Sequence, residues 1–284
     1  MNRAQEIYLV CSHELRRTLR SPKAAILLLL YALVATLAGL AFMHIKGFVG
    51  DTLDTTAGLG LAAEEADLYR KAVALFFGEG AAAHEWLFQV SPFLLFFYKF
   101  NLFFLPALVV LMGFDQISDE LQTRSLRYLA PRIHRESVLF GKLLSQLVLV
   151  VLLITVMSLG ALAFSDGAAK ASWSVSLFGM LRFGGQTLLV MLAYLGLTAL
   201  FSSLTRTPLY ALVFSLCALI GLWLMGTLAN FDSLTFLKWL TPTTYEPLLF
   251  SPQPLRLVGA LSAYAAFTAI FLGGALLRLR RCDL

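Results

Sequence analysis

The sequence predicts an all-α membrane protein with six transmembrane helices, an N-terminal interfacial elbow helix and both termini in the cytoplasm. Hydrophobic residues make up 59% of the 284 residues and charged residues only 14%, against about 45–50% and about 25% in soluble domains. Six apolar stretches are each long enough to cross the bilayer, which takes about 20 residues. Most Lys and Arg residues flank these stretches on one side, which is therefore expected to be cytoplasmic. The length leaves room for a single membrane domain, 1–284.

The six predicted spans are separated by segments of very different length. They cover residues 24–45, 93–114, 143–164, 177–202, 209–230 and 257–277. Basic residues cluster before the first span, between the second and third, and after the sixth, and an even number of spans returns the C-terminus to that side. Because these cations border apolar stretches, the net charge of +5 indicates membrane orientation and no nucleic-acid partner. The predicted location is a membrane that the chain crosses several times, with its basic segments on the cytoplasmic side.

Residues 1–22 predict a separate amphipathic helix. Ile7, Val10, Cys11, Leu15 and Leu19 recur at helical spacing, and most of the charged residues lie off that stripe. Such a pattern is typical of a helix that lies in the membrane interface. The alternative is a basic flank that only orients the first span.

Two outer segments differ in composition. Residues 46–92 form a long acidic loop, which is either a solvated connector or a contact for a periplasmic partner. Residues 231–255 hold four prolines among many apolar residues. We expect this segment to form short helices that are re-entrant or lie in the outer interface, with Trp239 and Tyr245 at headgroup depth.

The sequence lacks the common signatures of a membrane enzyme. His84-Glu85 begins a zinc-protease pattern, but Phe88 stands where the second histidine is required. No two of the four histidines are spaced i, i+4, and no phosphate-binding loop of the form G-x-x-x-x-G-K-[ST] occurs. We therefore expect no catalytic site, no metal site and no bound cofactor on this chain.

Four polar residues fall within the predicted spans. Lys99 and Asn101 lie in the second span, and Arg182 and Gln186 in the fourth. Polar groups in a membrane are candidates for a substrate path or for contacts between helices. The alternative for Lys99 and Arg182 is that their long side chains reach the outer headgroups, because both lie near that end of their spans.

The predicted cytoplasmic segment 115–142 carries charges of both signs, whereas orientation alone would need only cations. Residues 119–128 are expected to form a short helix that offers Leu121, Leu126 and Leu129 as apolar contacts. Apolar anchors surrounded by mixed charge suit a protein–protein dock. The alternative is an ordinary basic loop.

This segment resembles the corresponding loop of the permease subunits of ABC-2 type exporters. The pattern consists of an acidic residue, a hydrophobe, an acidic pair, L-x-x-P and an arginine, followed by Gly141-Lys142 at the start of the next span. Arg124 and the pair Ile133-His134 depart from it. The resemblance implies an ATPase-coupling site formed by Asp115, Asp119, Glu120, Leu121, Arg124, Leu126, Arg127, Leu129, Pro131 and Arg135.

The resemblance also implies partners and a mechanism. A separate ABC ATPase subunit would bind ATP and Mg²⁺, and a second copy of the chain or a paralogous permease would complete the pore in the lipid bilayer. The alternative is an ion-coupled secondary transporter or a channel without an ATPase, which would need intramembrane carboxylates or broken helices. The transported substrate does not follow from the sequence.

Overall fold

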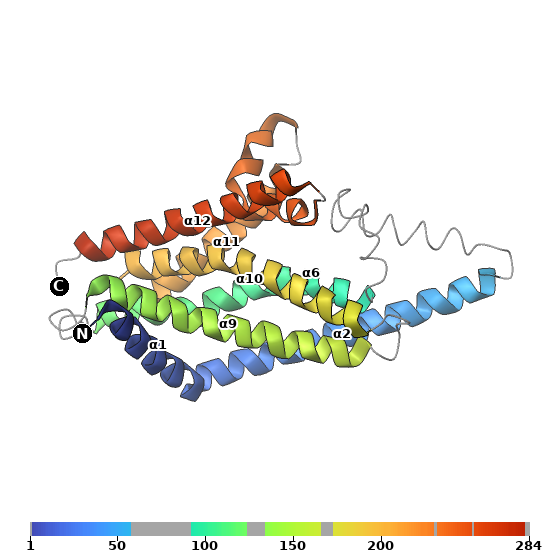
Figure 1. The fold of residues 1–284 in the computed structure, drawn as a ribbon, viewed down its shortest axis with the longest axis horizontal. Helices are drawn as coiled ribbons and strands as arrows, with labels where there is room; N and C mark the ends of the chain where they lie inside the picture. Colours follow the sequence, from blue (N-terminus) through green and yellow to red (C-terminus); the bar gives the residue numbers. More distant parts are fainter. Residues whose placement is uncertain are drawn as a thin grey trace.

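The computed structural model describes residues 2–57, 92–123, 134–165, 173–229, 232–251 and 253–281. These parts form helices and contain no strand. Six helical segments are long and apolar enough to cross a membrane, which confirms the predicted all-α class with six membrane-length helices. They are Pro22–His44, Phe93–Gln122, Arg135–Leu162, Ser176–Leu204, Pro208–Leu228 and Pro254–Arg281. The two chain termini lie at the same end of the bundle (Figure 1).

Two helices extend far beyond the predicted span limits, and a third is continued by a short helix. Helix α2 (Pro22–Ala57) continues well past residue 45, so the predicted outer loop begins inside a helix, and residues 58–91 lie outside the described parts. Helix α6 (Pro92–Gly113) is followed almost directly by α7 (Asp115–Gln122), with only Phe114 between them. Helix α9 (Arg135–Ser165) begins before the predicted span because the polar residues of its first turns have partners on other helices.

Helix α10 (Trp173–Leu204) lies at the centre of the bundle. It packs against α6, α9, α11 (Pro208–Leu228) and α12 (Pro254–Arg281). Within the most apolar stretch of each helix, 67% of the residues are buried in α10, whereas 17% are buried in α2 and 11% in α11. The two outer helices therefore keep broad apolar faces that are free for lipid or for another chain.

Glycine allows α10 and α12 to approach closely. A Cβ atom added at Gly196 of α10 would lie 3.2 Å from the Cβ of Phe271, and one added at Gly274 of α12 would lie 2.9 Å from Leu200. Small residues at helix contacts are typical of membrane bundles, where close packing replaces the hydrophobic effect as the main attraction. These contacts set the position of α12 against the centre of the fold.

The proline-rich segment forms three short 3₁₀ helices: η1 (Asp232–Leu240), η2 (Pro242–Tyr245) and η3 (Pro247–Phe250). Leu249 and Phe250 are buried against the bundle, and the hydroxyl of Tyr264 donates a hydrogen bond of 2.8 Å to the carbonyl of Pro242. Short helices were expected here. Their depth in the outer interface stays a prediction.

Candidate functional site

Helix α1 (Arg3–Arg20) packs beside the first turns of α9, at the end of the bundle that holds both termini (Figure 1). At Gly141 of α9 an added Cβ would lie only 2.7 Å from the Cβ of Val10 and 3.1 Å from the carbonyl oxygen of Ile7. The apolar stripe expected to face the membrane is therefore turned largely toward α9. The amphipathic helix is present, and its position in the interface stays a prediction.

Lys142 joins three helices through its buried ammonium group. Its Nζ lies 2.9 Å from Glu14 of α1 and 2.8 Å from Glu120 of α7, and it donates a 2.7 Å hydrogen bond to the carbonyl of Gln116. A lysine ammonium has three N–H donors, so these contacts use its full capacity. Since Lys142 is only 2% exposed, the charge is stable there only while the carboxylates surround it.

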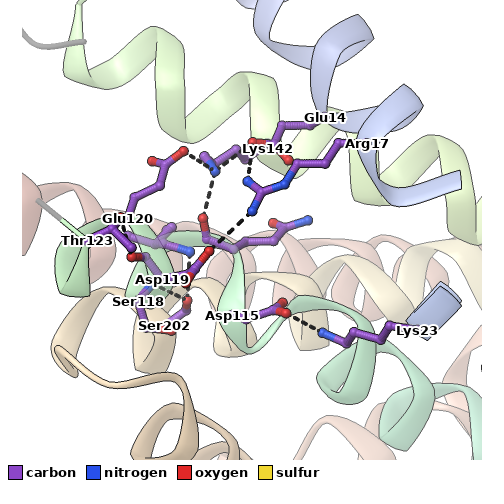
Figure 2. A network of polar contacts seen from close by, with 12 residues as sticks. Glu14, Arg17, Lys23, Asp115, Ser118, Asp119, Glu120, Thr123, Lys142 and Ser202 are labelled. Carbon is purple, nitrogen blue, oxygen red and sulfur yellow. Dashed lines mark hydrogen bonds and ion pairs between the residues drawn. The ribbon is translucent and has the colours of Figure 1, made fainter. Parts of the chain in front are cut away.

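Two further acidic residues of α7 form ion pairs with basic residues of α1 and of the start of α2. Asp119 lies 3.2 Å from Arg17 of α1, and Asp115 lies 2.6 Å from Lys23 at the start of α2. Lys23 also lies over the ring of Phe114, with Nζ 4.0 Å from the centroid. Figure 2 shows these pairs converging around α7. The ion-pair cluster consists of Glu14, Arg17, Lys23, Asp115, Asp119, Glu120 and Lys142.

A serine of the central helix fixes the backbone of α7. The hydroxyl oxygen of Ser202 in α10 accepts hydrogen bonds from the amides of Ile117 at 3.0 Å and Ser118 at 3.1 Å (Figure 2). Amides in the first turn of a helix have no partner within the helix itself. Ser202 therefore acts as a cap supplied by another helix, and it connects α7 to the centre of the bundle.

The start of α9 is held by α1 and α12 together. The ring nitrogen Nδ1 of His134 lies 3.1 Å from Glu6, and hydrogen bonds from Ser137 and His134 lower the pKa of Glu6 below its ordinary value of 4.5. Glu136 forms an ion pair with Arg280 near the end of α12. Arg135 donates a 2.9 Å hydrogen bond to the carbonyl of Leu279. The predicted cytoplasmic ends of α1, α9 and α12 therefore form one connected unit.

The predicted ATPase-coupling residues fall into two groups, apart from Arg135, which lies at the start of α9 and donates a hydrogen bond to the carbonyl of Leu279. The structure brings Asp115, Asp119 and Glu120 together on α7, but they bind residues of the chain itself, and Glu120 is only 8% exposed. Leu121 packs beside the buried Ile117 and Leu139, not on a free face. The helix expected over 119–128 instead begins at Asp115 and ends at Gln122. Arg124, Leu126, Arg127, Leu129 and Pro131 lie outside the described residues.

The predicted intramembrane polar residues Lys99, Asn101 and Gln186 contact other elements of the chain, and a role in a substrate path stays a prediction. Lys99 lies 3.5 Å from Glu246, which stands between η2 and η3. Burial raises the pKa of the Glu246 carboxyl. Gln186 donates a 3.2 Å hydrogen bond to the carbonyl of Leu249 in η3. Asn101 accepts a hydrogen bond from the hydroxyl of Tyr31 in α2, and Arg182 is half-buried on α10. Three of the four therefore connect elements of the chain.

Sequence reasoning missed the carboxylates of α1 and Glu246. Glu14 lies three positions after Cys11 and seven after Ile7, so it belongs to the same helix face as the apolar stripe. An acidic residue within an apolar stripe is a signal for a buried ion pair, and this signal was available. Glu246 stood among prolines and apolar residues, and nothing in the sequence indicated Lys99 as its partner.

The described residues contain no group of three or more His, Cys, Asp or Glu side chains that would hold a metal ion. Their charged side chains instead gather into ion pairs, most of them at one end of a bundle of six membrane-length helices. This arrangement defines a polytopic membrane protein in which one end carries the polar contacts between helices. A search of curated proteins gave no match.

A family model described as "ABC-2 family transporter protein" matches residues 8–272. The chain therefore belongs to the ABC-2 transporter family, as the resemblance in segment 115–142 indicated. It is a membrane component of an ABC transporter.

Proposed function

We propose that this chain is the permease subunit of an ATP-driven exporter in a bacterial cytoplasmic membrane. A separate ATPase subunit binds ATP and Mg²⁺, and a second copy of the chain or a paralogue completes the membrane domain. The observation that carries the proposal is the position of α7, which is bound to α1, α2, α9 and α10 by charged or hydrogen-bonded side chains.

The contacts of α7 support a mechanical role for the coupling segment. A movement imposed on residues 124–133 by the ATPase acts directly on α7 and on the start of α9, which flank them in the sequence. Lys142 then carries it to α1, and Lys23 carries it to α2. Packed helices respond to such forces by switching between discrete arrangements. The chain contributes rigid-body movement, and the partner contributes the chemistry.

Glu120 takes part in an internal ion pair with Lys142, so a substitution of Glu120 is a poor test of ATPase docking. Glu120→Arg would place a second cation beside the buried Lys142, so loss of ATPase binding could reflect a disrupted bundle. Leu126→Asp is the better docking variant because Leu126 belongs to the predicted anchors and is not part of the ion-pair cluster. We expect Leu126→Asp to abolish co-purification of the ATPase and to leave membrane insertion unchanged.

A second variant distinguishes binding of the ATPase from transmission of its movement to the membrane helices. Replacing Glu14 and Glu120 with Gln and Lys142 with Met removes the ionic link without leaving a buried charge uncompensated. We expect this neutral variant to retain the ATPase and to hydrolyse ATP in the complex without transport. The proposed function is wrong if wild-type transport continues after ATP depletion and stops when the proton gradient is dissipated.

A further inference from the structure

A cavity of about 140 Å³ lies between the end of α1, the start of α2 and the α6–α7 junction. One wall is charged and is formed by Arg17, Lys23, Asp115 and Asp119. The lining also includes apolar residues, among them Leu27 and Met112. Sites for drug-sized ligands measure about 300–1,000 Å³, so this cavity has room for a headgroup or a similarly small polar group.

Charges of both signs are available in this cavity, and the negative sign is in excess. Three carboxylates, Glu14, Asp115 and Asp119, and two cations, Arg17 and Lys23, line the cavity. The side chains of Arg17 and Lys23 are 56% and 35% exposed, which leaves their remaining donors accessible to an anion. A ligand with a cationic part and an anionic part therefore matches the cavity best.

The surroundings of the cavity add an apolar requirement. Ile26 and Leu30 of α2 are 65% and 49% exposed just beyond it, and Leu19 of α1 is 49% exposed beside it. This strip continues along α2, which the sequence places in the cytoplasmic half of the membrane. A ligand that fills both regions has a zwitterionic head and a hydrocarbon tail.

We propose that this cavity binds the headgroup of an ethanolamine phospholipid from the cytoplasmic leaflet. The primary ammonium donates hydrogen bonds to Asp115 and Asp119, the phosphate accepts them from Arg17 and Lys23, and the acyl chains lie along α2. A choline head has no N–H to donate, and a glycerol head has no cation. The bound head joins α1 to α7 at the site where the ion-pair cluster already connects them, and its binding does not require the ATPase.

Titration of the purified full-length chain in detergent micelles with dioleoyl lipids tests this proposal. Native mass spectrometry would report binding of the phosphatidylethanolamine, phosphatidylcholine and phosphatidylglycerol forms. We expect a Kd for the ethanolamine lipid about tenfold lower than for the glycerol lipid, because the glycerol head lacks the charge-assisted hydrogen bonds of the ammonium group. Equal binding of the ethanolamine and glycerol lipids would show that the cavity does not recognise an ammonium group and would overturn the proposal.

Two variants locate the bound lipid. Thr18→Trp fills the cavity without removing a charged side chain, and Asp119→Asn removes one acceptor charge. We expect the first to abolish the ethanolamine preference and the second to weaken it about tenfold. His13→Trp, an exposed position on the same helix, serves as the matched control and should keep wild-type binding. Wild-type preference in both cavity variants would place the lipid elsewhere and refute the proposal.

Discussion

The contact between α1 and α9 depends on the missing side chain at Gly141. Replacing this glycine with alanine would bring two Cβ atoms to within 2.7 Å of each other, whereas carbon atoms in contact lie about 3.5–4.0 Å apart. Val10 cannot relieve the clash by rotating, because the clashing atom is its own Cβ. The two helices must therefore separate by about 1 Å.

The same displacement breaks the buried ion pair. A shift of about 1 Å stretches the 2.9 Å contact between Lys142 and Glu14 beyond the range of a hydrogen bond, about 2.7–3.2 Å. Overpacking of this kind costs about 1–3 kcal/mol. We expect the loss to appear as opening of α1, because α1 is the shorter and less embedded partner.

Cys11 provides a reporter for this opening. It lies on α1, is 8% exposed, and burial raises the pKa of its thiol. In a chain with Cys217→Ser and Cys282→Ser, a maleimide reagent modifies Cys11 only when α1 opens. A destabilisation of about 1.4 kcal/mol makes this local opening, and hence the modification, about tenfold faster.

Two further variants make this prediction specific. Gly160→Ala in the same helix has no atom within 4 Å of the added Cβ, and we expect a wild-type labelling rate. Adding Val10→Gly to Gly141→Ala moves the glycine to the opposite helix and should restore much of the protection, less about 1 kcal/mol for glycine in a helix. An unchanged labelling rate in Gly141→Ala alone would refute the reasoning.

Three further predictions concern other contacts. Ser202→Ala removes the acceptor for two amides of α7 and should lower the free energy of unfolding by about 0.5–2 kcal/mol, measured by denaturation in detergent; an unchanged value would contradict the capping role. Because the pKa of Glu6 is lower in the folded chain, its ionised carboxylate stabilises the packing of α1 above pH 4.5, and this stabilisation is lost as the pH falls through the folded-state pKa. Hydrogen exchange in α1, corrected for intrinsic rates, should therefore be faster at about pH 3 than at pH 6. Equal protection at the two pH values would exclude this role. Lys99→Met leaves the buried Glu246 carboxylate unpaired and should lower Tm more than the Lys99→Met/Glu246→Gln pair does; the reverse order would count against the ion pair.

The six spans were predictable because each is determined by its own composition. An apolar stretch of sufficient length crosses the bilayer whatever its neighbours are. The first predicted span, 24–45, agrees with the apolar part of α2, Pro22–His44, although the helix itself continues to Ala57. Hydropathy predicts which residues lie in the membrane, but it does not predict where a helix ends.

The partners of the charged residues were only partly predictable from the sequence. Segment 115–142 was correctly identified as unusual for its mixed charge, but mixed charge is equally compatible with an external partner and with internal pairs. Glu14 and Lys142 are 128 positions apart, and only the packing of α1 on α9 brings them together. Gly141 permits this close approach, but the sequence does not show which helix packs against it.

The most direct test of the central claim is an ATP-dependent distance within this chain. Spin labels at Thr123→Cys, at the end of α7, and at His44→Cys, near the outer end of the span in α2, are placed in a chain with its three native cysteines replaced by serine. The chain is then measured in a nanodisc together with its ATPase. We predict that ATP with Mg²⁺ changes this distance in the wild-type background, and that the neutral Glu14→Gln/Glu120→Gln/Lys142→Met variant keeps the ATPase bound without the change. An identical change in both proteins, or none in the wild-type background, would contradict the account.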